Sequence, residues 1–148
     1  MAERGLTLLE VLMAVMLVGA LSAIAVPQVQ PPLDRWRLSA GTRQVVMDLK
    51  VARARAIAAG AAHRLRFTVP GSRYQLERQR PAGAYSPSGP AVALPDGVRI
   101  VDCTAAGDAV AFRPRGHAVS FGSVTLENAA GERRRVVVDI AGRLRVQR

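Results

Sequence analysis

Arginine is the residue type whose number and spacing suggest chemistry in this sequence of 148 residues. Lysine and arginine together number 21, against 11 aspartates and glutamates, and Lys50 is the single lysine. The formal net charge is +10 at pH 7. A guanidinium group is a fork of N–H donors that fits a phosphate or a carboxylate with two parallel hydrogen bonds. The excess of positive charge therefore favours a polyanionic partner or an anionic surface.

The positive charge continues to the C-terminus, where residues 113–148 hold eight arginines and three acidic residues, a net charge of +5. Alternation along a strand would place Arg143 and Arg145 on one face, about 7 Å apart. That spacing suits the regularly spaced phosphates of a DNA backbone. No residue suggests recognition of bases, so the hypothesis is sequence-independent binding of double-stranded DNA. The proposed contacts are Arg133, Arg134, Arg135, Arg143, Arg145 and Arg148.

The alternative for these arginines is structural. They would be solvated, or they would pair with Asp139 and Glu132 across a hairpin.

The sequence offers little for catalysis or metal binding. It contains no H-E-x-x-H, G-x-S-x-G or G-x-x-x-x-G-K-[ST] motif and no paired His/Cys spacing. His63, His117 and the single Cys103 are interpreted as structural or surface residues. One cysteine also rules out an internal disulfide framework. We therefore predict no catalytic residue, no metal site and no cofactor.

Residues 6–26 form an N-terminal stretch of 21 residues that are mostly apolar. As a helix, this stretch would cross a bilayer core of about 30 Å. One interpretation is an ordinary signal peptide, with Ala23-Ile24-Ala25 as the cleavage site and a secreted hydrolase as the function. A second is a plain membrane anchor. Neither gives a role to Glu10, whose carboxylate would cost about 2.5 kcal/mol or more near the membrane centre.

A third interpretation gives Glu10 a role. The run Gly5-Leu6-Thr7-Leu8-Leu9-Glu10-Val11 resembles the leader junction of type IV pilins and type II secretion pseudopilins. The resemblance implies that prepilin peptidase cleaves between Gly5 and Leu6 and methylates the new N-terminus at Leu6. Glu10, the fifth residue after the cut, would pair with the amino terminus of a neighbouring subunit during filament assembly. Leu6 stands where these families more commonly have Phe.

The same resemblance implies where the protein resides. Residues 6–26 would hold it in the bacterial inner membrane as a single pass, with a globular head in the periplasm or outside. Arg35 and Arg37 oppose a simple positive-inside count, but long domains translocate largely regardless of charge. The implied partners are prepilin peptidase, the inner membrane and other pilins or pseudopilins in a pilus or pseudopilus.

Prolines divide the helical part of the sequence. Pro27 predicts an interruption or a kink, and Pro31-Pro32 predict a bend or short linker, with Asp34 as a cap for a second helix. This second helix is predicted over residues 35–62, with a basic outer face that is either solvated or anion-binding. That face carries Arg43, Lys50 and Arg53. The buried stripe is predicted to comprise Leu38, Val45, Leu49, Ala52 and Ala56, widened by Val46 and Ile57.

From residue 63 the hydrophobic pattern changes to the alternation typical of strands. Glycine and proline separate the segments and no helical pattern intervenes, so antiparallel sheets are predicted. Residues 80–90, rich in Pro, Gly, Ser and Ala, predict an exposed loop. The predicted strands are residues 64–69, 74–79, 92–94, 98–103, 109–113, 118–126, 134–140 and 143–147.

Three short elements carry a second resemblance, to the GspH/FimT group of minor pilins and pseudopilins. Leu49-Lys50-Val51-Ala52-Arg53 is similar to that group's L-x-x-A-R helix, and Phe112-Arg113-Pro114-Arg115-Gly116 to its F-x-P-x-G element. Gly142-Arg143-Leu144-Arg145 matches the G-R-x-R element of FimT-type minor pilins. The resemblance associates this element with binding DNA during natural transformation. Type II secretion pseudopilins share the fold without that role.

Together these observations predict an α+β protein. A long N-terminal α-helix, membrane-spanning in its first half, packs on a C-terminal antiparallel β-sheet domain. The predicted parts are a leader (residues 1–5), a transmembrane and filament-core helix (6–27), a linker with the second half of the helix (28–62) and a globular head (63–148). The predicted function is that of a non-enzymatic, FimT-type minor pilin that binds DNA for uptake. The alternative is a GspH-type minor pseudopilin of a type II secretion system.

Overall fold

The computed structural model describes residues 8–147, and for residues 23–31 it describes the backbone alone. The chain divides into two compact units, Met1–Leu33 and Asp34–Arg148. Helix α1 (Leu8–Ala59) contributes its first half to the first unit and its second half to the second.

Helix α1 continues through all three prolines, so the linker predicted at Pro31-Pro32 is wrong. Proline donates no backbone hydrogen bond, but its fixed φ of about −65° is already helical. The missing donors are therefore not enough to end the helix here. Asp34 lies inside α1 instead of capping it, and its carboxylate is 3.6 Å from the guanidinium of Arg37. The helix ends at Ala59, before Gly60 and short of the predicted residue 62.

In the first unit, residues 8–33 belong to helix α1. The side chains of residues 8–22 are all exposed, and Glu10 lies in the first turn. Within the described residues, no helix combines the length and the apolar character needed to cross a membrane. The predicted cleavage residues, Gly5 and Leu6, lie outside the described part of the chain.

The second unit contains two antiparallel sheets. The first sheet has the order β3-β2-β1-β6, with β4 also paired to β2. Residues 80–90 were predicted as a loop, but they contain β3, which pairs with the end of β2. The strands of the first sheet are β1 (His63–Phe67), β2 (Arg73–Gln79), β3 (Tyr85–Pro87), β4 (Val92–Ala93) and β6 (Ala109–Phe112).

The second sheet has the order β5-β7-β8-β9. Its strands are β5 (Arg99–Cys103), β7 (Gly122–Glu127), β8 (Arg133–Val138) and β9 (Leu144–Gln147). A bridge between Gly71 and Ile100 joins the chain near β2 to β5. The strand predicted from residue 118 begins only at Gly122, because Ala118 instead forms a single bridge with Phe112 at the end of β6.

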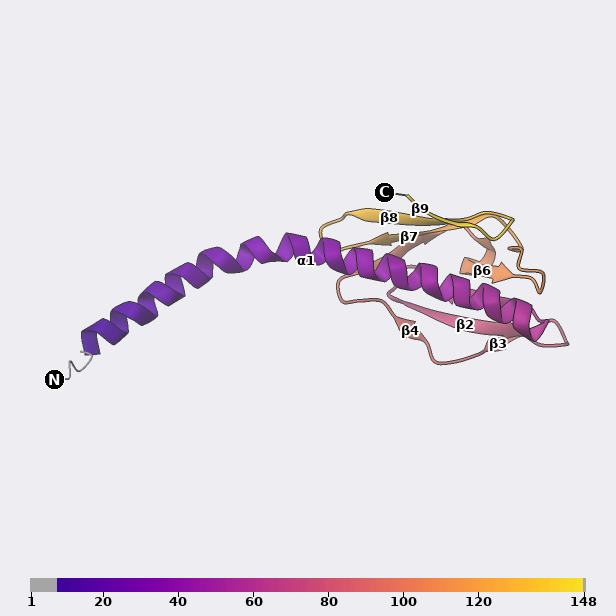
Figure 1. Cartoon of the computed structure of the whole chain (residues 1–148), viewed down its shortest axis with the longest axis horizontal. Coiled ribbons are helices and arrows are strands. Elements are labelled where there is room, and N and C mark those ends of the chain that lie inside the picture. Colours follow the sequence, from indigo (N-terminus) through magenta and orange to yellow (C-terminus); the bar gives the residue numbers. More distant parts are fainter. Residues whose placement is uncertain (1–7, 148) are drawn as a thin grey trace. The chain divides into compact units, whose positions relative to one another are not determined.

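The core of the second unit forms between the second half of α1 and both sheets. Figure 1 shows β7, β8 and β9 along one side of this half-helix and β2 to β4 along the other. One hydrophobic cluster joins α1 to residues such as Phe67, Phe112 and Val136 of the sheets. Burial of each large apolar side chain contributes about 1.5–3 kcal/mol. The centre of the predicted stripe is confirmed, since these residues are all buried: Leu38, Val45, Leu49, Ala52 and Ala56. Val46 is half-buried against the core, but the predicted widening by Ile57 is wrong, because Ile57 is exposed.

Polar contacts add to this packing. The hydroxyl of Tyr74 on β2 donates a hydrogen bond to the carboxylate of Asp48 on α1. Desolvation by burial, together with this carboxylate, raises the pKa of Tyr74 far above its ordinary value. The phenol is therefore neutral at physiological pH and serves as a donor that ties α1 to the first sheet. The structure confirms the α+β class with antiparallel sheets.

Candidate anion-binding site

The turn between β8 and β9 positions the arginines of the G-R-x-R element. The amide of Asp139 donates to the carbonyl of Arg143 (3.0 Å), and the amide of Gly142 donates to the carbonyl of Asp139 (2.9 Å). Gly142 has a φ of +76°, a conformation that glycine adopts without the clash other residues incur. Arg143 thus leaves the turn and Arg145 follows on β9, at the edge of the second sheet.

A hollow of about 530 Å³ lies between α1 and this turn, and we call it the hairpin hollow. Lys50 and Arg53 reach it from α1, and Arg143 and Arg145 from the hairpin. Its remaining lining residues are Ala54, Ile57, Gly142 and Leu144, so its described lining contains four basic side chains and no acidic one.

The four cations of the hairpin hollow differ in their partners. Arg143 pairs with Asp139, with Nε and the carboxylate oxygen 3.2 Å apart. Arg53 is half-buried and donates to the carbonyls of Gly116 (2.8 Å) and Gly142 (3.3 Å). Among the described residues, Lys50 and Arg145 form no ion pair. Within the part of the chain that the structure describes, no acidic side chain therefore compensates these two charges directly.

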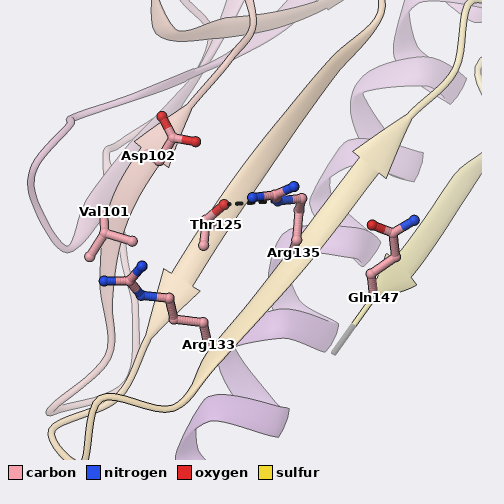
Figure 2. Close-up of a pocket in the computed structure, with 6 residues that line it drawn as sticks. All are labelled: Val101, Asp102, Thr125, Arg133, Arg135 and Gln147. Atoms are coloured by element: carbon pink, nitrogen blue, oxygen red, sulfur yellow. Dashed lines mark hydrogen bonds between the residues drawn. The ribbon is translucent and has the colours of Figure 1, made fainter.

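Arg133 and Arg135 lie elsewhere, on the face of the second sheet turned away from α1. Figure 2 shows their side chains in front of the sheet and the helix behind it. They line a second hollow of about 490 Å³, the outer hollow. Its other lining residues are Val101, Asp102, Thr125 and Gln147. By register, Arg145 is opposite Val137 and shares this outer face, but its side chain lines the hairpin hollow.

Acidic and hydroxyl groups engage the arginines of the outer face. The buried Glu127 accepts hydrogen bonds from Arg99 Nη2 and Arg133 Nε, both at 2.6 Å. These bonds, from Arg99 first and then Arg133, lower the pKa of the Glu127 carboxyl. Arg135 Nε lies 3.4 Å from the Thr125 hydroxyl, the contact drawn as a dashed line in Figure 2. One carboxylate thus compensates part of the outer charge.

Arg134, one of the two remaining predicted contacts, lines neither hollow. Arg134 is opposite Leu126 and therefore points to the face of the sheet that carries the core. Arg148 lies outside the described residues. Of the two acids considered as partners, Asp139 pairs with Arg143, whereas Glu132 pairs with Arg35 of α1 at 2.8 Å.

The histidines and the cysteine are the other residues whose side chains could bind a metal or react, and their surroundings indicate a structural role. His63 is buried, with Nδ1 2.9 Å from the carbonyl oxygen of Ala61, and His117 is exposed. Burial raises the pKa of the half-buried Cys103 thiol, which disfavours the reactive thiolate. Within the described residues, no group of three or more His, Cys, Asp and Glu side chains could hold a metal ion.

Comparison with known proteins identifies the family to which this architecture belongs. The family model of the type II transport protein GspH matches residues 41–142, more than half of the chain. The chain belongs to the GspH family. It is a GspH/FimT-like minor pilin or pseudopilin, and because such proteins are structural, it is not an enzyme.

Two solved structures show how the GspH-family fold of this chain recurs. The minor pseudopilin EpsH from the type 2 secretion system of Vibrio cholerae is 15% identical, with a TM-score of 0.63 over 75% of this chain and 96% of EpsH. The type IV minor pilin FimU of Pseudomonas aeruginosa is also 15% identical, with a TM-score of 0.62 over 78% of this chain and 91% of FimU. At this identity the likeness concerns the fold. No curated protein sequence matches the chain.

Two basic residues of the hairpin hollow were not among the DNA contacts predicted from the sequence, although they lie within the part of the chain that matches the GspH family. Lys50 and Arg53 were placed on the outer face of a helix, yet both line the hairpin hollow. The L-x-x-A-R element that contains them was the available signal, and it lies within the matched residues. Arg143 and Arg145 follow immediately after the last matched residue, Gly142.

Proposed function

We propose that this GspH-family chain is a FimT-type minor pilin whose hairpin hollow binds the phosphate backbone of double-stranded DNA for uptake in natural transformation. One observation carries the proposal: Lys50, Arg53, Arg143 and Arg145 converge on an open hollow without an acidic side chain in its described lining. A phosphate in this hollow would meet positive charge from both α1 and the hairpin.

The partners of these cations favour binding of a phosphate. Lys50 and Arg145 form no ion pair within the described residues, so no protein contact has to break before they bind. Arg143 would share its charge with Asp139, but a surface pair of this kind is worth only about 0–1 kcal/mol. Phosphate contacts carry no sequence information, and we therefore expect sequence-independent binding.

DNA titrations of the full-length protein in neutral detergent test this function. We expect weak binding that falls steeply as salt rises, because each phosphate contact releases condensed counterions. The double variant Arg143→Gln/Arg145→Gln should lose about 1–3 kcal/mol of binding free energy and up to about two units of salt slope. Wild-type protein that does not bind at low salt would contradict the proposal.

A second function is that of a minor pseudopilin in a type II secretion system. The observation in its favour is that EpsH matches the fold as well as FimU does, with TM-scores of 0.63 and 0.62. The head would then contact other pseudopilins instead of DNA. A strain that lacks the gene for this protein separates the two functions. Loss of protein secretion with intact DNA uptake favours the pseudopilin, and loss of DNA uptake with intact secretion favours the pilin.

The N-terminal part of the proposal concerns maturation. Residues 1–5 would be a leader that prepilin peptidase removes between Gly5 and Leu6, with methylation of Leu6. Residues 6–26 would stay in the inner membrane before assembly, with the head in the periplasm or outside. The exposed apolar side chains of residues 8–22 support this, because such a surface needs a lipid or protein environment. The intact mass of membrane-extracted protein should show loss of residues 1–5 and one added methyl group, whereas a start near residue 26 would favour an ordinary signal peptide.

Glu10 would guide assembly with other pilins. Glu10 lines a hollow on the exposed helix together with Val11, Ala14, Val15 and Val18, and this apolar setting suits assembly against the amino terminus of a neighbouring subunit. Glu10→Val should therefore leave cleavage and membrane insertion intact but reduce incorporation into filaments. Wild-type amounts of the variant in sheared pili would remove this role.

A further inference from the structure

Three segments that are distant in sequence meet at the side chain of Arg53. Its Nε donates to the carbonyl of Gly116 (2.8 Å), and its Nη1 donates to the carbonyl of Gly142 (3.3 Å). Gly116 closes a turn through its amide, which donates to the carbonyl of Arg113 (2.8 Å). Gly142 closes the β8–β9 turn with Asp139. One guanidinium on α1 therefore holds two turns of the second unit.

The contact depends on the absence of side chains at both glycines. A Cβ at Gly142 would lie 2.5 Å from the Gly116 carbonyl oxygen and 3.2 Å from Arg53 Nε. A Cβ at Gly116 would lie 3.0 Å from Ile57 Cδ1 and 3.3 Å from Arg53 Nε. The glycines thus let both turns close on the guanidinium.

Arginine suits this contact better than lysine does. A guanidinium presents several N–H donors in a rigid plane, so it can reach two carbonyls in fixed directions at once. A lysine ammonium is a point charge on a flexible stem and does not fix the relative position of two acceptors. Lysine at this position would keep the charge but lose the geometry.

We propose that Arg53 is a positioning residue that fixes the β8–β9 turn against α1, so that Arg143 and Arg145 converge with Lys50 on the hairpin hollow. The part of this proposal that is tested by DNA affinity rests on the proposed DNA-binding function. The role of Arg53 is then geometric: without its two hydrogen bonds, the arginines that follow Gly142 would no longer be held toward the hollow.

The charge-conserving variant Arg53→Lys tests this proposal in the full-length protein. We expect DNA affinity to fall roughly tenfold, as for the loss of one or two charge-assisted contacts. The salt slope should also fall by about one unit, although the net charge is unchanged. Amide hydrogen exchange should accelerate at residues 139–145. Arg55→Lys, on the same helix but outside the hairpin hollow, is the matched control and should change none of these readouts.

A second variant changes the geometry without touching an arginine. Gly142→Ala places a methyl group against the Gly116 carbonyl and should reproduce the losses of Arg53→Lys. Gly131→Ala in the β7–β8 turn is its control. Gly131 has a φ of +79°, close to the +76° of Gly142, but a Cβ there meets nothing within 4 Å. Both glycine variants therefore carry similar backbone strain, and only Gly142→Ala disturbs the contact with Arg53.

The two readouts separate this inference from the proposed function. If wild-type protein fails to bind DNA, the proposed function fails, and hydrogen exchange at residues 139–145 still decides the role of Arg53. Exchange that stays at wild-type rates in both Arg53→Lys and Gly142→Ala would overturn the inference. Equal acceleration in Gly131→Ala and Gly142→Ala would also overturn it, because strain alone would then explain the effect.

Discussion

The hairpin hollow and the outer hollow both contain arginines from the C-terminal stretch, yet their charges have different surroundings. In the outer hollow, Arg133 shares the buried Glu127 with Arg99, and Asp102 contributes to the lining. In the hairpin hollow, the described lining includes no acid. The same residue type thus stabilises the sheet in one place and leaves charge available in the other.

The difference arises from pairing across strands. Antiparallel register places Glu127 opposite both Arg99 and Arg133, so the carboxylate lies between two guanidinium groups. Arg145 is on an edge strand opposite Val137 and meets no acid there. Net charge along a sequence therefore does not locate a binding surface, because register decides which charges cancel.

The largest expected effect comes from removing two charges in the hairpin hollow. Arg143→Gln/Arg145→Gln should lose about 1–3 kcal/mol of DNA-binding free energy, since contacts to charged groups are strong. Arg133→Gln/Arg135→Gln removes the same charge and should lose clearly less at about 0.1 M salt, where separated charges are screened beyond about 10 Å. Titrations of both variants at one ionic strength compare the two hollows directly. Equal losses would break the distinction between them.

Much of the fold follows from local patterns in the sequence. The helical stripe of Leu38, Val45 and Leu49 is buried as predicted, because spacing at three, four and seven residues fixes one helix face. Strand positions also follow from alternation. The prolines misled the prediction: Pro31-Pro32 suggested a linker, but helical φ angles and the surrounding hydrogen bonds keep α1 continuous. Strand β3 was missed because its pairing with β2 is tertiary, while its Pro- and Ser-rich sequence is typical of loops.

The candidate site was predictable only in part. The same-face spacing of Arg143 and Arg145 was visible in the alternating sequence, and both line the hairpin hollow. Lys50 and Arg53 were not assigned to it, since Arg53 contacts residues 63 and 89 positions away. Periodicity places a side chain on a helix face, but it does not say which turn packs against that face. Gly5, Leu6 and Arg148 lie outside the described residues, so their roles stay predictions.

A smaller effect is expected from single cations on the exposed side of α1. Lys50 lines the hairpin hollow, whereas Arg43 lies outside it, with its Nε donating to the carbonyl of Ser39. Lys50→Gln should weaken DNA binding about threefold and lower the salt slope by about one unit, as for one lost phosphate contact. Arg43→Gln should leave both quantities near their wild-type values. If the two variants behave alike, the helix contributes only a diffuse charge and the hollow does not include Lys50.

The smallest effect concerns the stability of the outer face and its dependence on pH. Hydrogen bonds from Arg99 and then Arg133 lower the folded-state pKa of Glu127 below its ordinary value of 4.5. A lowered folded-state pKa adds stability that is fully present above the unfolded-state pKa and is lost as the pH falls through the folded-state value. In the wild-type protein, the urea concentration at the unfolding midpoint should therefore decrease as the pH is lowered below about 4.5.

Glu127→Gln isolates this carboxylate. The variant should be less stable at pH 7, with a shallower decline toward acid pH, while Glu132→Gln, which removes an exposed pair with Arg35, serves as the control. The DNA affinity of Glu127→Gln at pH 7 should stay near the wild-type value, because Arg99 and Arg133 lie outside the hairpin hollow. Tighter DNA binding by Glu127→Gln would show that the carboxylate masks cations that DNA can reach. The two hollows would then act as one binding surface. The distinction between a DNA-binding hairpin hollow and a stabilising outer hollow would be wrong.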